Sequence, residues 1–285
     1  MVGTAGVRLL AGVDSVLRLT HLCMPGIDYT NLEYGSSLGF ASVASNNGHD
    51  GNSGLAFANN SEVLADFTSR AIHVETIVGK ELIAAYYERS PKRSYYMGCS
   101  TGGRQGVYAA LHYPADFDGI LAGAPATNYN HLLGWSGMIT RYLGAPHGDE
   151  SANFIPAHLW DLVSEEILRQ CDGLDGVTDG IITEPDACEF VPETLLCEGR
   201  SIDKCLSKTQ VEVLRKIYSP LYDLNGNLLF PRFDPGAESS TFSERALFSG
   251  KPFPYTEVSF KLHENSVWLL SCVGCYAPAL GKIRH

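Results

Sequence analysis

The sequence predicts an α/β fold built around a parallel sheet. Between residues 39 and 125, short apolar runs of strand length alternate with longer segments of helical periodicity. Strands separated by helices of about ten or more residues form parallel βαβ units, because a parallel connection has to cross the sheet. The composition is that of a globular protein, since 45% of the 285 residues are apolar and 19% are charged.

The first predicted strand is the apolar run Gly39–Ser45, which ends in a loop rich in Asn and Gly, residues 46–54. A helix is predicted next. Its apolar residues recur at steps of three and four: Val63, Phe67, Ala71, Val74, Val78 and Leu82. This spacing is typical of an amphipathic helix, and either Asn60 or Ser61 has the side chain of an N-terminal cap.

The next three elements surround a short glycine-rich sequence. Ser94–Gly98 is predicted to be a buried strand, Gly102–His112 a helix, and Asp118–Gly123 a further strand. Residues 98–102 are Gly-Cys-Ser-Thr-Gly and fit the pattern G-x-S-x-G. Because this pattern follows a strand and opens a helix, it indicates the nucleophile elbow of an α/β-hydrolase.

The elbow gives Ser100 a chemical role. A sharp turn flanked by glycines exposes the serine hydroxyl above the end of the strand, where it is placed to attack an ester carbonyl. The amide N–H of Thr101, at the start of the helix, is placed to donate to the oxyanion that forms. The sequence therefore predicts a serine hydrolase with Ser100 as its nucleophile.

A catalytic serine requires a general base, usually a histidine oriented by a carboxylate, and in α/β-hydrolases both residues follow the serine in the chain. The histidines after Ser100 are at positions 112, 131, 147, 158, 263 and 285. His112 lies on the helix that follows the elbow, too close in sequence to reach back over it. The others have no recognisable motif around them. The sequence alone does not identify the base.

After Asn128 the character of the chain changes. Helices predicted near His158–Arg169 and Ser207–Tyr218 are separated by loops rich in Cys, Gly and Asp. Leu224–Leu228 resembles a hairpin turn, because Asn-Gly tolerates positive φ. The predicted domains are residues 1–127, a partial hydrolase core with the elbow; residues 128–256, an inserted lid domain; and residues 257–285, an atypical C-terminal tail.

Charge and cysteine content restrict the partners and the compartment. A formal net charge of −11 argues against a nucleic-acid partner, which requires a basic surface, and no apolar run is long enough to cross a bilayer. Cys171 with Cys188, and Cys197 with Cys205, are spaced as in local disulfide loops. This spacing favours an oxidising compartment, so we expect a secreted protein. The oligomeric state is not predicted.

Several blocks of the sequence resemble the fungal tannase and feruloyl esterase family. They are the elbow region Tyr95–Gly106, the upstream stretches Ile27–Asn31, Ala44–Gly51 and Arg70–His73, and the downstream stretch Pro114–Ala126. The resemblance covers about residues 27–255. It implies an α/β-hydrolase fold with a lid inserted from Asn128 onward. It also implies hydrolysis of small-molecule phenolic esters, galloyl or feruloyl, by an acyl-enzyme route on Ser100.

Two parts of the sequence depart from the family. Its catalytic Asp and its His-Cys pair have no counterpart in this chain, and the residues before about 26 and after about 255 do not resemble it. By the resemblance, Cys99 pairs with the cysteine after the catalytic His, so we expect Cys99 to lack its partner here and Ser100 its base. The chain is interpreted as a truncated member whose core is incomplete at both ends.

A loop in the insertion carries closely spaced carboxylates. Asp172, Asp175 and Asp179 follow one another at steps of three and four among glycines, and such acids repel one another without a cation. Oxygen ligands of this kind suit Ca²⁺, although the spacing is not that of an EF-hand. The resemblance implies a structural Ca²⁺ ion held by these three side chains and by the carbonyl oxygens of Val177 and Ile181, with a Cys171–Cys188 disulfide clamping the loop.

Three functions follow from these features. The leading one is a serine carboxylesterase that acts on phenolic esters and has a calcium-bound lid. The alternatives are a catalytically inactive fragment of such an esterase and a calcium-stabilised binding module; a strained, exposed serine argues against the binding module. Gallate and ferulate are not distinguished, because that choice depends on pocket groups that meet the ring hydroxyls.

Overall fold

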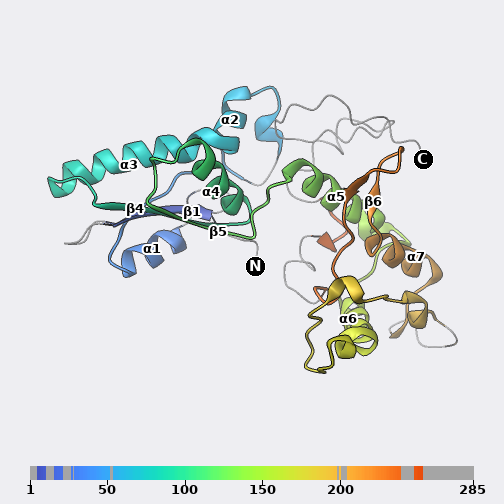
Figure 1. Ribbon diagram of the computed structural model, residues 1–285. Helices are drawn as coiled ribbons and strands as arrows, with labels where there is room; N and C mark the ends of the chain where they lie inside the picture. Colours follow the sequence, from blue (N-terminus) through green and yellow to red (C-terminus); the bar gives the residue numbers. More distant parts are fainter. Residues whose placement is uncertain are drawn as a thin grey trace. The chain divides into compact units, whose positions relative to one another are not determined.

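The structure is a computed structural model that describes residues 5–10, 16–21, 27, 29–51, 54–197, 199, 204–238 and 247–252 (Figure 1). For residues 5–10 and 16–21 only the backbone is described. Within these ranges the chain forms two compact units, and the boundary falls between Asn130 and His131. The predicted tail, residues 257–285, lies outside the described residues. No helix in the described ranges is long and apolar enough to span a membrane.

The first unit is built on a five-stranded sheet in the order β3-β2-β1-β4-β5. The strands are β1 (Ala5–Leu10), β2 (Val16–His21), β3 (Ala41–Val43), β4 (Arg93–Cys99) and β5 (Gly119–Gly123). β2 runs parallel to both β3 and β4, and β4 runs parallel to β5, which confirms the predicted α/β class. β1 departs from an all-parallel sheet because it is antiparallel to β2 and β4. Neither β1 nor β2 was among the predicted strands.

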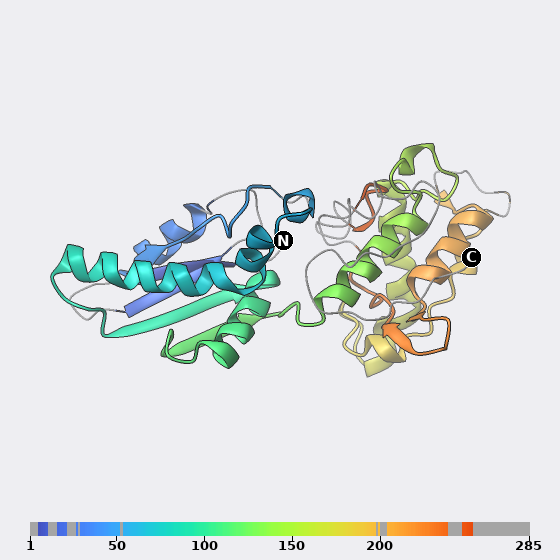
Figure 2. The same cartoon turned by 90° about the horizontal axis from the view of Figure 1, so that it is seen from above.

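Helices cover both faces of this sheet. They are α1 (Tyr29–Ser37), the short 3₁₀ helix Gly54–Phe57, α2 (Ser61–Ala65), the π-helical turn Asp66–Arg70, α3 (Ala71–Tyr87) and α4 (Thr101–His112). Figure 1 shows α1 on one face and α3 and α4 on the other, and Figure 2 shows α3 extending along the strands. Asn60 caps α2, since its side-chain oxygen accepts a hydrogen bond from the amide of Val63 at 3.3 Å.

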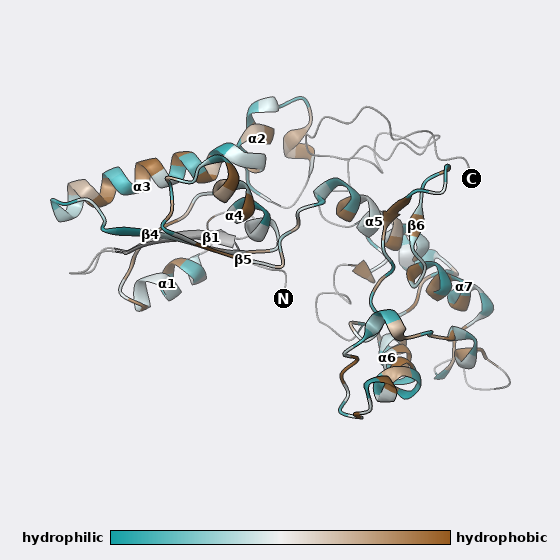
Figure 3. Cartoon of the chain, in the orientation of Figure 1, coloured by the Kyte–Doolittle hydropathy of each residue, from teal (hydrophilic) through white to brown (hydrophobic). Residues whose placement is uncertain are grey.

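The buried face of α3 differs from the apolar face that the sequence pattern indicates. The pattern puts Val74, Val78 and Leu82 on the apolar side, whereas these side chains are 47, 45 and 60% exposed. Ile72 and Ile83 enter the core instead, together with Tyr96, Ala109 and Phe117. The π-helical turn adds a residue to one helical repeat, so it rotates everything after it relative to the residues before it. Figure 3 shows polar and apolar residues alternating along α3.

The second unit is mainly helical. Its elements are α5 (Tyr129–Tyr142), which begins at the unit boundary, α6 (Ala157–Cys171), α7 (Lys208–Ile217), the hairpin strands β6 (Leu221–Tyr222) and β7 (Leu228–Phe230), and the 3₁₀ helices Gly148–Glu150, Asp172–Asp175, Pro185–Ala187 and Pro192–Leu195. α6, α7 and the hairpin lie where the sequence predicts them, and Ser207 caps α7 in a capping box with Gln210. α5 was not predicted.

The core of the second unit surrounds Trp160, which is fully buried. Its indole stacks on the ring of Phe248, with centroids 3.8 Å apart. Its N–H donates to the carbonyl oxygen of Ile155 at 3.1 Å, so the only polar atom of the side chain is satisfied. Apolar side chains from α5, α6 and α7 complete this core, and this unit therefore has a core of its own.

Candidate active site

Ser100 lies at the junction of β4 and α4. Its φ of 61° and ψ of −117° form a positive-φ conformation that is rare for residues other than glycine. Two backbone hydrogen bonds hold the turn. The amide of Ser100 donates to the carbonyl oxygen of Gly123 at 3.0 Å, and the amide of Ala126 donates to the carbonyl oxygen of Ser100 at 3.1 Å. A strained serine between a parallel strand and a helix has the geometry of a nucleophile elbow.

The turn is so tight that its neighbours have to be glycine. A Cβ atom on Gly98 would lie 2.6 Å from both the carbonyl oxygen of Gly102 and the hydroxyl oxygen of Tyr96. A Cβ atom on Gly103 would lie 2.3 Å from the carbonyl oxygen of Gly123. These glycines let α4 approach the ends of β4 and β5 closely, and this approach fixes the position of the serine between them.

The Ser100 hydroxyl makes no hydrogen bond to any residue in the described part of the chain. Thr101 is buried and starts α4, and the amide of a first helical residue has no partner within its helix. An ester carbonyl placed over the turn would therefore meet both this N–H donor and the positive end of the helix dipole. This arrangement suits the stabilisation of an oxyanion.

Arg104 ties the first turn of α4 to the π-helical turn before α3. Its guanidinium donates to the carbonyl oxygens of Thr68 at 3.0 Å and of Phe67 at 3.3 Å. The same group lies over the rings of Phe67 and Tyr129, at 5.3 and 4.9 Å from their centroids. Arg104 belongs to the glycine-rich block around the elbow, and in the structure it links the elbow helix α4 to the π-helical turn.

None of the histidines that the structure describes is hydrogen-bonded to Ser100. The Nδ1 atom of His73 lies 2.7 Å from an oxygen of Asp116. His49 packs against phenylalanine rings, and burial lowers its pKa. His112 stacks on a tyrosine of its own helix. His263 and His285 lie outside the described residues. No general base is identified among the described histidines.

The predicted calcium ligands lie in one loop, but their carboxylates do not converge. Asp172, which is buried, accepts a hydrogen bond from the amide of Asp179 at 3.3 Å. Asp175 accepts from the amide of Val177 at 2.9 Å, and Asp179 accepts from the amide of Ile181 at 3.1 Å. Among the described residues, no group of three or more acidic, histidine or cysteine side chains is arranged to hold a metal. The loop has donor atoms that suit Ca²⁺, but not in a converging arrangement.

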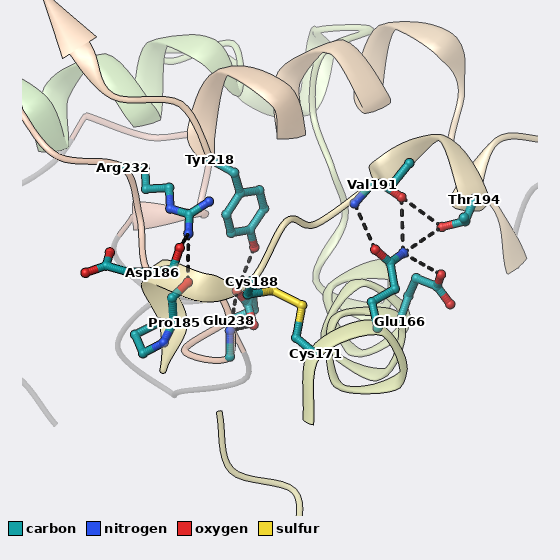
Figure 4. Close-up of a disulfide and its surroundings, with 12 residues drawn as sticks. Glu166, Cys171, Pro185, Asp186, Cys188, Val191, Thr194, Tyr218, Arg232 and Glu238 are labelled. Carbon is teal, nitrogen blue, oxygen red and sulfur yellow. Dashed lines mark hydrogen bonds between the residues drawn. A yellow bond between two sulfur atoms is a disulfide. The ribbon is translucent and has the colours of Figure 1, made fainter. Parts of the chain in front are cut away.

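Both predicted disulfides are present, and Figure 4 shows the first of them. Cys171–Cys188 joins the end of α6 to the residue after the short helix Pro185–Ala187, and Cys197–Cys205 closes a smaller loop. Beside the first disulfide, the buried hydroxyl of Tyr218 donates to Glu238 at 2.7 Å (Figure 4). Cys99, next to Ser100, forms no disulfide with any of the described cysteines.

A strained serine at the carboxyl end of a parallel strand, followed by a helix that packs on the sheet, defines the nucleophile elbow of an α/β-hydrolase. The sequence model of the family described as "Tannase and feruloyl esterase" matches residues 19–247. The chain belongs to this family, as the blocks around the elbow predicted.

Individual relatives agree with this assignment. A probable feruloyl esterase B-2 of Aspergillus flavus is 46% identical over 236 residues, which are 82% of this chain and 44% of the relative. A probable feruloyl esterase B of Emericella nidulans is 48% identical over 232 residues, 81% of this chain and 43% of the relative. The chain spans about half the length of the curated relatives it matches.

Solved structures show the same fold. A crystal structure of an esterase from Aspergillus oryzae has a TM-score of 0.73 at 44% identity, over 87% of this chain and 49% of that one. Feruloyl esterase B from the same organism has a TM-score of 0.72 at 42% identity, over 81% and 46%. A tannin acyl hydrolase from Aspergillus niger, at 23% identity and a TM-score of 0.55, shares the fold.

Proposed function

We propose that this protein is a carboxylic ester hydrolase that acts on phenolic esters through an acyl-enzyme on Ser100. The observation that carries the proposal is the position of Ser100, whose strained backbone holds the hydroxyl at the start of α4, where no described residue bonds to it. Such strain persists where the surrounding structure enforces it, and it is concentrated at functional sites. Here the backbone hydrogen bonds of Ser100 to Gly123 and Ala126 and the glycine contacts enforce it.

In the proposed reaction the Ser100 oxygen attacks the ester carbonyl carbon while a general base takes the hydroxyl proton. The amide of Thr101 donates to the carbonyl oxygen as it becomes negative, and such a donor contributes about 3–4 kcal/mol in known hydrolases. The C–O bond to the alcohol then breaks, and the alcohol leaves with a proton. Water attacks the acyl-enzyme in the same way, which releases the phenolic acid and restores Ser100.

The substrate class is supported by the relatives. The curated relatives at 46 and 48% identity are named probable feruloyl esterases, a solved feruloyl esterase B is 42% identical, and the tannin acyl hydrolase shares the fold at 23%. A feruloyl ester is therefore the first substrate to test and a galloyl ester the second. No nucleic-acid or membrane partner is part of the proposal.

The test is the release of ferulic or gallic acid from methyl ferulate and methyl gallate by the full chain, with Ser100→Ala as its matched variant. We expect the wild-type protein to release at least one of the two acids and the variant to release neither. Binding of these esters by folded wild-type protein without any release would contradict the proposal and indicate a binding module.

We also propose a structural calcium ion in the loop of Asp172, Asp175 and Asp179, with carbonyl oxygens of Val177 and Ile181. Its support is the donor chemistry and the buried carboxylate of Asp172. Asp175 and Asp179 each accept their amide hydrogen bond through Oδ1, so their second carboxylate oxygens remain available to a cation. We expect EDTA to lower the melting temperature of the wild-type protein but not that of Asp172→Asn. An unchanged melt of the wild type would contradict the proposal.

Secretion is proposed from the two disulfides, because such bonds persist in oxidising compartments. The prediction is that the protein accumulates in the culture medium of its native host with both disulfides intact. Mass spectrometry of alkylated protein, before and after reduction, reads their state. A native protein with Cys171, Cys188, Cys197 and Cys205 all alkylated before reduction would contradict it.

A further inference from the structure

The segment Ser45–Asp50, called the β3 loop below, emerges at the same edge of the sheet as Ser100. β3 and β4 both run parallel to β2, so their carboxyl ends point the same way, and the β3 loop and the elbow follow those two ends. A direct contact joins them through the elbow helix. Gln105, five residues after Ser100 in α4, donates from Nε2 to Oδ1 of Asn47 at 3.2 Å.

The β3 loop is held in an unusual conformation by the helices around it. Asn47 has a φ of 57° and is 3% exposed, and Gly48 has a φ of 85°. A Cβ atom on Gly48 would lie 2.5 Å from the Cβ of Asp66, so the backbone passes directly against the π-helical turn. The ring of His49 packs edge-on against that of Phe67, with centroids 5.4 Å apart.

The third helix that holds this loop is α3, through Glu75. Its Oε2 atom accepts a hydrogen bond from the hydroxyl of Ser45 at 2.8 Å, across 30 positions of sequence. The side chain is buried, and no lysine or arginine in the described ranges is paired with it. Among the residues that the structure describes, its Oε1 atom has no hydrogen-bond partner, and the same is true of two other buried oxygens on the flanking elements, Ser42 Oγ and Gln105 Oε1.

A carboxylate ion with one hydrogen bond is strongly unfavourable in such a place, because burial removes its hydration. Burial accordingly raises the pKa of Glu75 to about 8. The neutral acid avoids this penalty, and its carbonyl oxygen can still accept the hydrogen bond from Ser45. An apolar side chain would fill the same volume but would leave Ser45 without its acceptor. The carboxyl is therefore suited to orienting the loop.

We propose that Glu75 is a positioning residue that holds the β3 loop against α3 and α4 at the carboxyl-terminal edge of the sheet, where Ser100 lies. An effect of Glu75 on catalysis rests on the proposed esterase function, whereas its role in ordering the β3 loop is independent of that function. Glu75 acts through Ser45 and does not touch the substrate. The Gln105–Asn47 hydrogen bond is the second tie of the same loop.

The experiment is hydrogen–deuterium exchange of the full chain, read on peptides that cover residues 44–51. Glu75→Met removes the hydrogen bond and keeps the volume, whereas Glu75→Gln keeps a neutral group that can both accept and donate. We expect Glu75→Met to speed exchange of these peptides by about tenfold, the equivalent of one lost hydrogen bond. We expect Glu75→Gln to restore wild-type exchange. Glu81→Met, an exposed position on the same helix, is the matched control.

Two further variants keep the proposal falsifiable if Glu75→Met unfolds. Ser45→Ala removes the same hydrogen bond from the loop side, and Asn47→Ala removes the second tie. Faster exchange confined to residues 44–51 supports the proposal. Exchange equal to wild type in Ser45→Ala, or exchange in Glu75→Gln as fast as in Glu75→Met, overturns it.

Labelling of Ser100 with a fluorophosphonate is measured on the same samples. If the wild type is not labelled, the esterase proposal fails, and the exchange data still decide the role of Glu75.

Discussion

The hydroxyl of Tyr96 donates a hydrogen bond to the carbonyl oxygen of Gly102, at 2.7 Å, beneath the turn that carries Ser100. Tyr96 is 1% exposed and lies in the core between α3 and α4. The bond joins the last part of β4 to the first turn of α4, on either side of the elbow. A side chain of the strand thus supports the start of the helix.

Tyr96→Phe tests this support. The substitution keeps the ring and removes this one hydrogen bond, while the carbonyl of Gly102 still faces the helical amide four residues further along α4. We expect the free energy of unfolding to fall by about 0.5–1.5 kcal/mol. Urea unfolding measures it. Tyr95→Phe on the same strand, at a position 37% exposed, is the control and should change little. Equal stability of Tyr96→Phe and the wild type would show that the bond does not support the turn.

Gly98→Ala tests the close approach of α4 to β4. Its Cβ would meet the carbonyl of Gly102 and the hydroxyl of Tyr96 at 2.6 Å, so we expect a loss of about 1–3 kcal/mol in stability and slower labelling of Ser100. At Gly123 the nearest atom to a new Cβ is 3.5 Å away, so Gly123→Ala should stay within about 0.5 kcal/mol of wild type. Two variants with the same effect would contradict the steric argument.

The buried Glu75 predicts a pH dependence of stability. Its pKa rises from 4.5 to about 8 on folding, so the folded state binds the proton more tightly than the unfolded state. The stability that the folded state gains from binding this proton is complete below about pH 4.5. It declines as the pH rises towards 8 and changes no further above that. We expect the stability of the wild type relative to Glu75→Gln to fall between pH 5 and pH 8, in urea unfolding at several pH values. Parallel profiles would show that Glu75 does not titrate in this window.

The two disulfides should contribute unequally. Cys171–Cys188 spans a sequence separation of 17 and Cys197–Cys205 one of 8. A longer closed loop restricts the unfolded chain more, so we expect the double Cys→Ala variant of the first pair to lose about 2–4 kcal/mol. The second pair should lose about 0.6 kcal/mol less by chain entropy alone. Urea unfolding of the two double variants measures the difference. A larger loss at Cys197–Cys205 would contradict this order.

The elements around Ser100 could be predicted from the sequence because their signals are local. The glycines that permit the turn, the apolar strand before it and the helix after it all lie within about twenty residues, and the structure has β4, α4 and β5 at these positions. The disulfides were predictable for the same reason, since each joins cysteines that are close in the chain.

Features that depend on distant contacts were not predictable. Which face of α3 is buried depends on the π-helical turn before it, and no residue pattern in the sequence predicts that turn. The prediction that Val74 and Val78 lie on the buried face is therefore wrong. Glu75 resembles a solvent-exposed helical residue in the sequence, and its partner Ser45 is 30 positions away.

The role of Ser100 as the nucleophile is tested most directly by covalent labelling of the full chain with a fluorophosphonate, followed by peptide mass spectrometry. We expect one modified serine, in the peptide that contains Ser100, with labelling slowed by methyl ferulate and absent in Ser100→Ala. Folded wild-type protein in which Ser100 stays unmodified, or in which another serine takes the label, would contradict it.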